Sequence, residues 1–397
     1  MTEKFKQTSI VDLTHHLLVE GVNKRASDIL IEPLDDELQI RFRIDGVLSK
    51  FASLPSEMHS KIITRIKVMA GLDISEKRLP QDGSFKMKFP GKEVDFRVSV
   101  VPSRLGERAV LRVLDKGRLI LDINKLGLDP YSLTSLKESL LKPYGIILIC
   151  GPTGCGKTTT LYASIKYIDS IEKNIVTVED PVEYQLYGIN QVQINEEIGL
   201  TFPAVLRSIL RQDPDVILVG EIRDSETAEI AIRAALTGHL VLSTLHTTTA
   251  TGGVIRLINM GIEPYLISSS CLLIASQNLV RLLCPDCKKP QPLPKVISVQ
   301  LEQYGYKKEE IPEVIYTAKG CEKCNNTGYF GRRAIMEALV LSPEIRELIE
   351  KNAPEREIRK KARMQGMRSL RERGYELLMK GLTSLEEVIR VTSAQEV

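Results

Sequence analysis

The segment that most constrains the fold is Gly151-Pro-Thr-Gly-Cys-Gly-Lys157-Thr158, which directly follows the apolar run from 145 to 150. It matches G-x-x-x-x-G-K-[ST], in which a strand leads through a glycine-rich turn into a helix whose N-terminus holds phosphates. Lys157 would reach the β- and γ-phosphates, and the Thr158 hydroxyl would bind Mg²⁺. We therefore expect ATP to bind to Gly151, Pro152, Thr153, Gly154, Cys155, Gly156, Lys157, Thr158 and Thr159.

Three more apolar strands are predicted after this motif, at 174–178, 215–219 and 240–245, with a helix at 228–236. Continuous apolar strands that alternate with helices are typical of a parallel sheet covered on both faces. The pattern predicts an α/β core.

Carboxylates follow two of these strands. Glu179 and Glu183 lie in Thr177-Val-Glu-Asp-Pro-Val-Glu183, and Glu221 ends Asp215-Val-Ile-Leu-Val-Gly-Glu221. The carboxyl ends of parallel strands meet at the ligand-binding edge, where a carboxylate can orient a water molecule and take its proton. Asp215 opens its strand at the far edge, so we expect it to be structural.

Two histidines, His239 and His246, flank the strand at 240–245. Only one of them can lie at the phosphate edge of the sheet. His246, at the carboxyl end, is the candidate for sensing the γ-phosphate.

The first 115 residues show a different pattern. Apolar residues alternate with polar ones at 38–44, 85–89 and 94–100, and a helical spacing lies between them at 62–69. One-sided alternation indicates a sheet with one solvated face, so this region is expected to be an α+β domain. Residues 116–128 then read as a linker or hinge.

Four of the seven cysteines form two C-x-x-C pairs, Cys284/Cys287 and Cys321/Cys324. Four thiolates would make a closed tetrahedral Zn²⁺ site, which is structural because every ligand position is filled by protein. We expect a zinc-binding subdomain at 281–331 whose intervening loop packs on its own. A charged helical region is expected at 332–397.

The charge balance gives little attraction to nucleic acid. The chain has 54 Lys and Arg against 51 Asp and Glu, a net charge of +3, with 5% aromatic residues and no Trp. No apolar run approaches the about 18 residues of a membrane span. The first residues also lack the apolar segment of a signal peptide, which favours the cytoplasm.

Taken together, these motifs resemble the secretion ATPases of the type II secretion, type IV pilus and competence systems. The P-loop, E-D-P-V-E, G-E-I-R-D and G-H-L-V-L-S-T-L-H-T occur in that family's order. Three N-terminal segments also match, Arg25-Ala-Ser-Asp-Ile-Leu-Ile-Glu-Pro33, Phe42-Arg-Ile-Asp-Gly46 and Gly106-Glu-Arg-Ala-Val-Leu-Arg112. The resemblance implies a PAS-like N-terminal domain, residues 1–115, followed by a RecA-like core, residues 129–280, with the nucleotide between them.

The resemblance also implies functional residues. Two arginines of the N-terminal domain reach the phosphates in this family, and by position these are Arg97 and Arg112. Glu179 or Glu183 would act on water, and Glu221 on Mg²⁺ or water. We favour Glu179 and Glu221 as the pair, but the division of roles stays open.

The function implied is that of a homo-hexamer that hydrolyses ATP to assemble a type IV pilus or type II secretion pseudopilus. It would act on an inner-membrane platform protein from the cytoplasmic face, without nucleic acid, and the tetracysteine element is typical of assembly motors. The PAS-like region begins almost at once, so we expect a chain without the family's extra N-terminal domain, whether naturally short or trimmed. The alternative is a hexameric RecA-like DNA-translocating motor, which the charge balance disfavours. A catalytically dead scaffold ranks last because the catalytic residues are present.

Overall fold

The computed structural model describes residues 9–115, 117 and 119–393. The chain forms two compact units, residues 1–119 and residues 120–397. The division falls inside the segment expected to be a linker.

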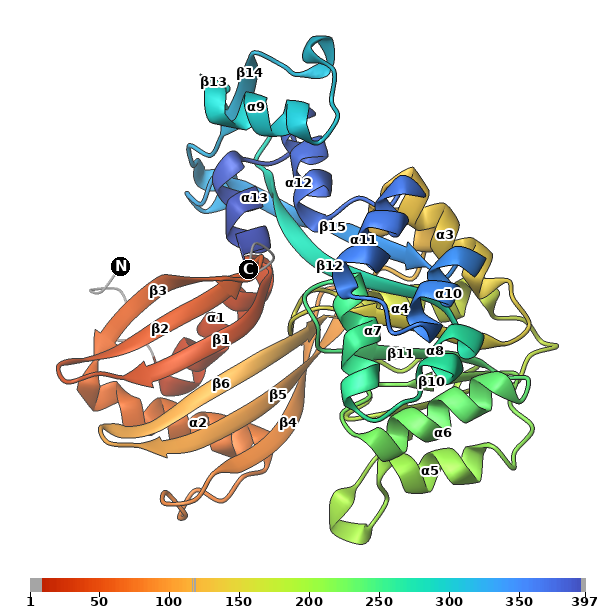
Figure 1. Ribbon diagram of the computed structural model, residues 1–397. Helices are drawn as coiled ribbons and strands as arrows, with labels where there is room; N and C mark the ends of the chain where they lie inside the picture. The colour runs from red at the N-terminus through yellow and green to blue at the C-terminus, as the bar shows by residue number, and fades with distance from the viewer. Residues whose placement is uncertain (1–8, 116, 118, 394–397) are drawn as a thin grey trace. The chain divides into compact units, whose positions relative to one another are not determined.

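The first unit is a six-stranded antiparallel sheet in the order β3-β2-β1-β6-β5-β4. Two helices, α1 and α2, lie on one face of it (Figure 1). The elements are α1 (Ile10–Asn23), β1 (Ala26–Pro33), β2 (Glu37–Ile44), β3 (Val47–Pro55), α2 (His59–Ala70), β4 (Gln81–Phe89), β5 (Lys92–Ser103) and β6 (Gly106–Asp115).

The predicted alternation in this unit is confirmed. Leu38, Ile40 and Phe42 of β2 are buried, and in β5 every second residue from Val94 to Val100 is buried as well. They pack against Ile62, Ile63 and Ile66 of α2 and against α1. The intervening polar residues lie on the other face of the sheet, because successive side chains of a strand point to opposite sides.

The second unit is built on a seven-stranded sheet in the order β15-β12-β7-β11-β10-β8-β9. All neighbouring strands are parallel except β15, which runs antiparallel to β12. The strands are β7 (Gly145–Cys150), β8 (Ile175–Glu179), β9 (Asn190–Gln193), β10 (Val216–Val219), β11 (Leu240–Leu245), β12 (Cys271–Leu283) and β15 (Tyr329–Val340). The predicted parallel sheet is confirmed.

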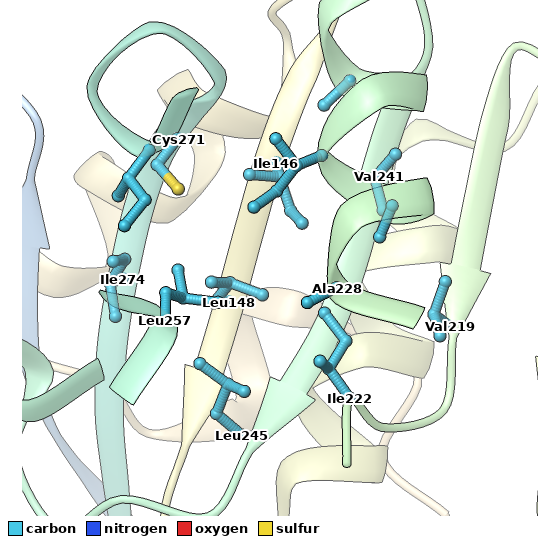
Figure 2. Close-up of a cluster of buried hydrophobic side chains, with 14 of the residues drawn as sticks. Ile146, Leu148, Val219, Ile222, Ala228, Val241, Leu245, Leu257, Cys271 and Ile274 are labelled. Carbon is cyan, nitrogen blue, oxygen red and sulfur yellow. The ribbon is translucent and has the colours of Figure 1, made fainter. Parts of the chain in front are cut away.

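Helices cover both faces of this sheet, since every residue of β7, β8, β10 and β11 is buried. Figure 2 shows one face, where Ile146, Leu148, Val241 and Leu245 of the sheet meet Ala228 and Leu257 of the covering helices. The helices of this unit that surround the sheet are α3 (Pro130–Leu140), α4 (Lys157–Ile168), α5 (Phe202–Ile209), α6 (Ser225–Leu236), α7 (Ala250–Asn259), α8 (Pro264–Ser270), α10 (Pro343–Glu350) and α11 (Glu355–Met364).

A small insert separates β12 from β15. It contains α9 (Lys295–Gln303) and the two-stranded sheet of β13 (Lys289–Pro292) and β14 (Val314–Thr317). Ile297, Leu301 and Ile315 of the insert share a core with α12 (Leu370–Met379) and α13 (Leu385–Thr392). The expectation that this loop packs on its own is therefore wrong: the apolar side chains of the insert bury more surface against these two helices than they would alone.

The long strands β12 and β15 connect the core sheet to this insert. The expected boundaries at 280/281 and 331/332 fall inside β12 and β15. The region from 332 onward, expected to be helical, thus begins with a strand. The sequence pattern of β12 is interrupted by polar residues, which is why strand periodicity alone did not identify it.

Candidate active site and metal centre

The carboxyl ends of four parallel strands bring the predicted motifs to one edge of the second unit's sheet. In register, Cys150 at the end of β7 pairs with Leu245 of β11, and Val219 of β10 pairs with Val178 of β8 and with Ser243. The residues that follow these strands are therefore neighbours. They include the P-loop, Glu179, Glu221 and His246.

The P-loop (residues 151–158) joins β7 to the 12-residue helix α4, which begins at Lys157. Gly151, Gly154 and Gly156 all have positive φ, at 144°, 80° and 90°, conformations that side chains other than glycine rarely adopt. The Lys157 amine donates to the carbonyl oxygens of Gly151 at 2.7 Å and Pro152 at 3.1 Å. The loop thus presents a helix N-terminus and a cation together, the arrangement that binds phosphate.

Glu179, at the end of β8, is almost fully buried, with 4% exposure. Its two carboxylate oxygens accept hydrogen bonds from the Tyr162 hydroxyl at 2.5 Å, the Thr177 hydroxyl at 2.5 Å and the Gln191 amide at 3.1 Å. Burial, followed by this contact with Glu179, raises the pKa of Tyr162. Both oxygens have partners within the chain, so Glu179 ties β8 to α4 and β9.

Glu183 lies in the loop after β8, beyond the cis peptide bond between Asp180 and Pro181, and is half-buried. The loop continues to β9, and the Gln193 amide oxygen there accepts from the Val182 N–H at 3.2 Å. Glu183 is thus held near the end of β8, but on a loop and not on the sheet edge itself.

Glu221 lies at the centre of a charged cluster. Its Oε2 is 3.0 Å from His246 Nε2, and its Oε1 forms an ion pair with Arg223, which in turn lies 3.5 Å from Asp180. Burial raises the pKa of Glu221, but the hydrogen bonds from Arg223 and His246 outweigh burial and hold the pKa below its usual range. The carboxylate is therefore ionised at neutral pH, as an acceptor of a proton must be.

The two histidines separate as predicted. His246 lies at the carboxyl edge, on Glu221, whereas the His239 ring binds the Ala234 carbonyl oxygen at 2.9 Å before β11 begins. Asp215 lies at the same far edge and accepts from the Asn174 N–H at 2.7 Å, which confirms its structural role.

Arg97 and Arg112 belong to the first unit, where they are directly opposite each other on β5 and β6. They share the solvated face of that sheet. The Arg112 side chain is 55% exposed, and its Nε lies 3.5 Å from Asp28 on β1. Strand register thus makes the two arginines cross-strand neighbours, although they are 15 positions apart in sequence.

The four cysteines of the two C-x-x-C pairs come together. Their sulfur atoms all lie within 4.8 Å of one another, and three of the Sγ–Sγ distances are 3.7–3.8 Å. A tetrahedral Zn²⁺ with Zn–S bonds of about 2.3 Å requires sulfur atoms about 3.8 Å apart. The backbone N–H groups of Cys321 and Gly328 donate to Cys324 Sγ at 3.1 and 3.2 Å, which suits a thiolate. The residues present fit zinc.

Sequence reasoning missed the residues that hold these groups in place. Tyr162 and Gln191 bind Glu179, Arg223 binds Glu221, and Gln277 of β12 contacts the P-loop. The one available signal was a polar residue within an otherwise apolar stretch, as at Gln277.

In the described ranges, no helix combines the length and the apolar character that crossing a membrane requires.

The sequence was compared with known families and proteins. The profile of the family described as "Type II/IV secretion system protein" matches residues 3–390. The type IV pilus assembly ATPase PilB of Myxococcus xanthus is 49% identical over 395 residues, covering 99% of this chain and 69% of the relative. The type II secretion system ATPase E of Vibrio cholerae is 48% identical over 392 residues, covering 99% and 77%.

Solved structures show the same fold. The crystal structure of the pilus retraction motor PilT with bound ADP is 26% identical, with a TM-score of 0.62, over 95% of this chain and 96% of that one. The ATPase DotB of Yersinia pseudotuberculosis has a TM-score of 0.71 at 21% identity, over 97% and 94%, a likeness of fold alone.

Proposed function

The chain belongs to the type II/IV secretion system protein family, and from this premise we propose that it powers the assembly of a type IV pilus or a type II secretion pseudopilus. It is an ATP hydrolase of α/β fold. The observation that carries the proposal is the near-50% identity to a pilus assembly ATPase and a secretion ATPase over 99% of the chain.

ATP is proposed to bind through the P-loop. Backbone N–H groups of residues 153–159 and the Lys157 amine would bind the phosphates, and the exposed Thr158 hydroxyl is a fitting ligand for Mg²⁺. When bound, Mg²⁺ neutralises charge on the phosphates. The chain's own part is to position the γ-phosphate near the edge where Glu221 and His246 lie.

Glu221 is the proposed acceptor of the proton from water. It is ionised and only partly buried, and the side chains of its partners His246 and Arg223 are about half exposed. Glu179, by contrast, is almost fully buried among Tyr162, Thr177 and Gln191. The burial of Glu179 therefore favours Glu221 over the pairing of the two that the sequence suggested. Glu183 remains a second candidate, and His246 is proposed to respond to the γ-phosphate through Glu221.

Arg97 and Arg112 are proposed to add positive charge at the transferring phosphate. Positioned arginines can speed phosphoryl transfer by several orders of magnitude because they neutralise charge that develops in the transition state. The pairing of the two residues on adjacent strands supports a joint role.

The domain assignment is proposed as follows. Residues 1–115 form a PAS-like domain, 116–128 a hinge and 129–280 a RecA-like core. Residues 281–331 contain the zinc-binding cysteines and 332–397 form the C-terminal region, with β12 and β15 of the core sheet crossing the two boundaries. Zn²⁺ held by the four thiolates would crosslink the base of the insert and is structural, with every ligand position filled by protein.

The working assembly is proposed to be a homo-hexamer at the cytoplasmic face of the inner membrane, acting on a platform protein. The family resemblance supports this proposal. The relatives named above are secretion and pilus ATPases, so they lend no support to the alternative of a DNA-translocating motor.

A pull-down from bacterial membranes with and without ATP tests the proposal. We expect to recover a membrane protein of a pilus or secretion system, in an amount that depends on ATP. With the matched variant Lys157→Ala, the recovered amount should no longer depend on ATP. Recovery of nucleic acid in place of a membrane protein would favour the DNA motor.

A further inference from the structure

The Gln277 side chain of β12 bridges the P-loop and the first turn of α4. It is 1% exposed. Its Nε2 donates to the Cys155 carbonyl oxygen at 2.8 Å, and its Oε1 accepts from the Thr160 hydroxyl at 2.7 Å. A carbonyl can only accept, so the orientation of the Gln277 amide is determined by these two partners.

The backbone of Gln277 also lies against the loop. Ser276 pairs with Cys150 in register, so Gln277 lies level with the first P-loop residue. A Cβ on Gly151 would come within 2.5 Å of the Gln277 carbonyl oxygen, and a Cβ on Gly156 within 3.0 Å of its Nε2. The loop therefore rests on β12 at both of its ends.

The bond to Cys155 controls the orientation of one peptide group. In a planar trans peptide, the C=O and the following N–H point in opposite directions. Because Gln277 holds the Cys155 carbonyl toward β12, the N–H of Gly156 points to the opposite side of the loop. Gly156 has a φ of 90° and no side chain, so little else in its own structure would prevent this peptide from turning.

We propose that Gln277 is a positioning residue for nucleotide binding, which holds the Cys155–Gly156 peptide so that the Gly156 N–H faces the phosphates. The inference rests on the proposed role of residues 151–159 in binding ATP. It adds a determinant of phosphate affinity that lies 122 residues away from the loop it acts on.

The test is ADP affinity, measured by calorimetry on the full chain, for Gln277→Met. Methionine has a similar length and volume but makes neither hydrogen bond. A buried carbonyl left without its donor is costly, so we expect ADP to bind at least about 10-fold more weakly. The KM for ATP should rise by a similar factor with kcat changed less than about threefold, because phosphate contacts are made in both the ground and transition states.

Two further variants separate positioning from general stability. Asn278→Leu removes a hydrogen bond from the adjacent residue to the Val391 carbonyl, at 2.8 Å and away from the loop. It should lower the melting temperature but leave ADP affinity within about twofold. Thr160→Val leaves the bond between Gln277 and Cys155 in place. It should therefore weaken ADP binding less than Gln277→Met does.

Each result is decisive. Wild-type ADP affinity in a folded Gln277→Met protein overturns the inference, and so does an equal loss in Asn278→Leu. If Gln277→Met does not fold, Gln277→Asn, which is one methylene too short to span both partners, takes its place under the same criterion. Failure of the wild-type chain to bind ADP would instead contradict the P-loop assignment itself.

Discussion

His246 Nε2 lies 3.0 Å from Glu221 Oε2, so the ends of β11 and β10 are joined by a contact between two side chains 25 residues apart. The contact brings together the two residues that the sequence placed in separate motifs. Together with Arg223 it holds Glu221 ionised at the edge of the sheet where the P-loop begins. A ligand that draws His246 away would change the charge environment of the carboxylate expected to act on water.

Glu221→Gln is expected to abolish hydrolysis while leaving ATP binding intact. Glutamine keeps the shape but cannot accept a proton, so kcat should fall by at least about 100-fold. Steady-state hydrolysis and calorimetric ATP affinity measure the two effects. Wild-type turnover in this variant would contradict the assignment.

Glu179→Gln should behave differently, because Glu179 is an anchor between β8, α4 and β9. The amide nitrogen of glutamine can replace only one of the two oxygens, so either Tyr162 or the pair Thr177 and Gln191 loses its acceptor, which should cost about 1–3 kcal/mol of unfolding free energy. Turnover of the folded protein should fall less than about 10-fold. A loss of turnover equal to that of Glu221→Gln, without a loss of stability, would reverse the roles of the two carboxylates.

Arg97→Ala and Arg112→Ala should each lower kcat by about 100-fold or more, since each removes positive charge from the transition state. Arg108→Ala is the matched control, because Arg108 belongs to the same strand as Arg112 but pairs with Glu32 at 2.9 Å. Hydrolysis assays on the three variants test whether the effect is specific to Arg97 and Arg112. An equal effect of all three would indicate a general loss of the sheet's charge and not a specific role.

The tetracysteine cluster should carry about one equivalent of Zn²⁺ per chain, measured by elemental analysis of the purified protein. Cys321→Ser should lower the metal content and the melting temperature together. Cys271→Ala, which alters a buried cysteine outside the cluster, should keep the metal. A zinc content below about half an equivalent in the wild-type protein would count against the site.

The free energy of unfolding should depend on pH through Glu387. Burial raises its pKa, but hydrogen bonds from Arg390 and Arg281 outweigh burial and hold the pKa below its usual range. The folded pKa therefore lies below the unfolded value of about 4.3, so the stabilisation is present above that pH and is lost as the pH falls through the folded pKa.

Glu387→Gln should accordingly lower the unfolding free energy by about 3 kcal/mol at pH 7, because it leaves Arg281 without its buried partner. The difference from wild type should shrink below about pH 4. Urea denaturation at pH 7 and at about pH 2 measures it, with the exposed neighbour Glu386→Gln as the control. An equal difference at pH 7 and at about pH 2, where the Glu387 carboxyl is largely protonated in the unfolded chain and becomes protonated in the folded one, would show that the ion pair is not responsible.

Much of the fold could be predicted because it depends on local patterns. The alternation in β2 and β5 and the apolar runs of β7, β8, β10 and β11 are properties of a few adjacent residues, and burial follows them closely. β12 was not identified, because its polar residues Ser276, Gln277 and Asn278 interrupt the apolar pattern. Each of those side chains has a partner on another element, Thr248, Cys155 and Val391, which no local pattern reveals.

The P-loop, the two cysteine pairs and the edge of the sheet at which Glu179, Glu221 and the two histidines lie could all be predicted from the sequence alone. These follow from motif spacing and from the direction of the strands. The different surroundings of the two carboxylates became visible only in the folded chain: Glu179 is buried among Tyr162, Thr177 and Gln191, whereas Glu221 is partly exposed and contacts His246 and Arg223. The physical reason is that burial and hydrogen-bond partners depend on which segments the strand register and helix packing bring together, and residues distant in sequence supply them.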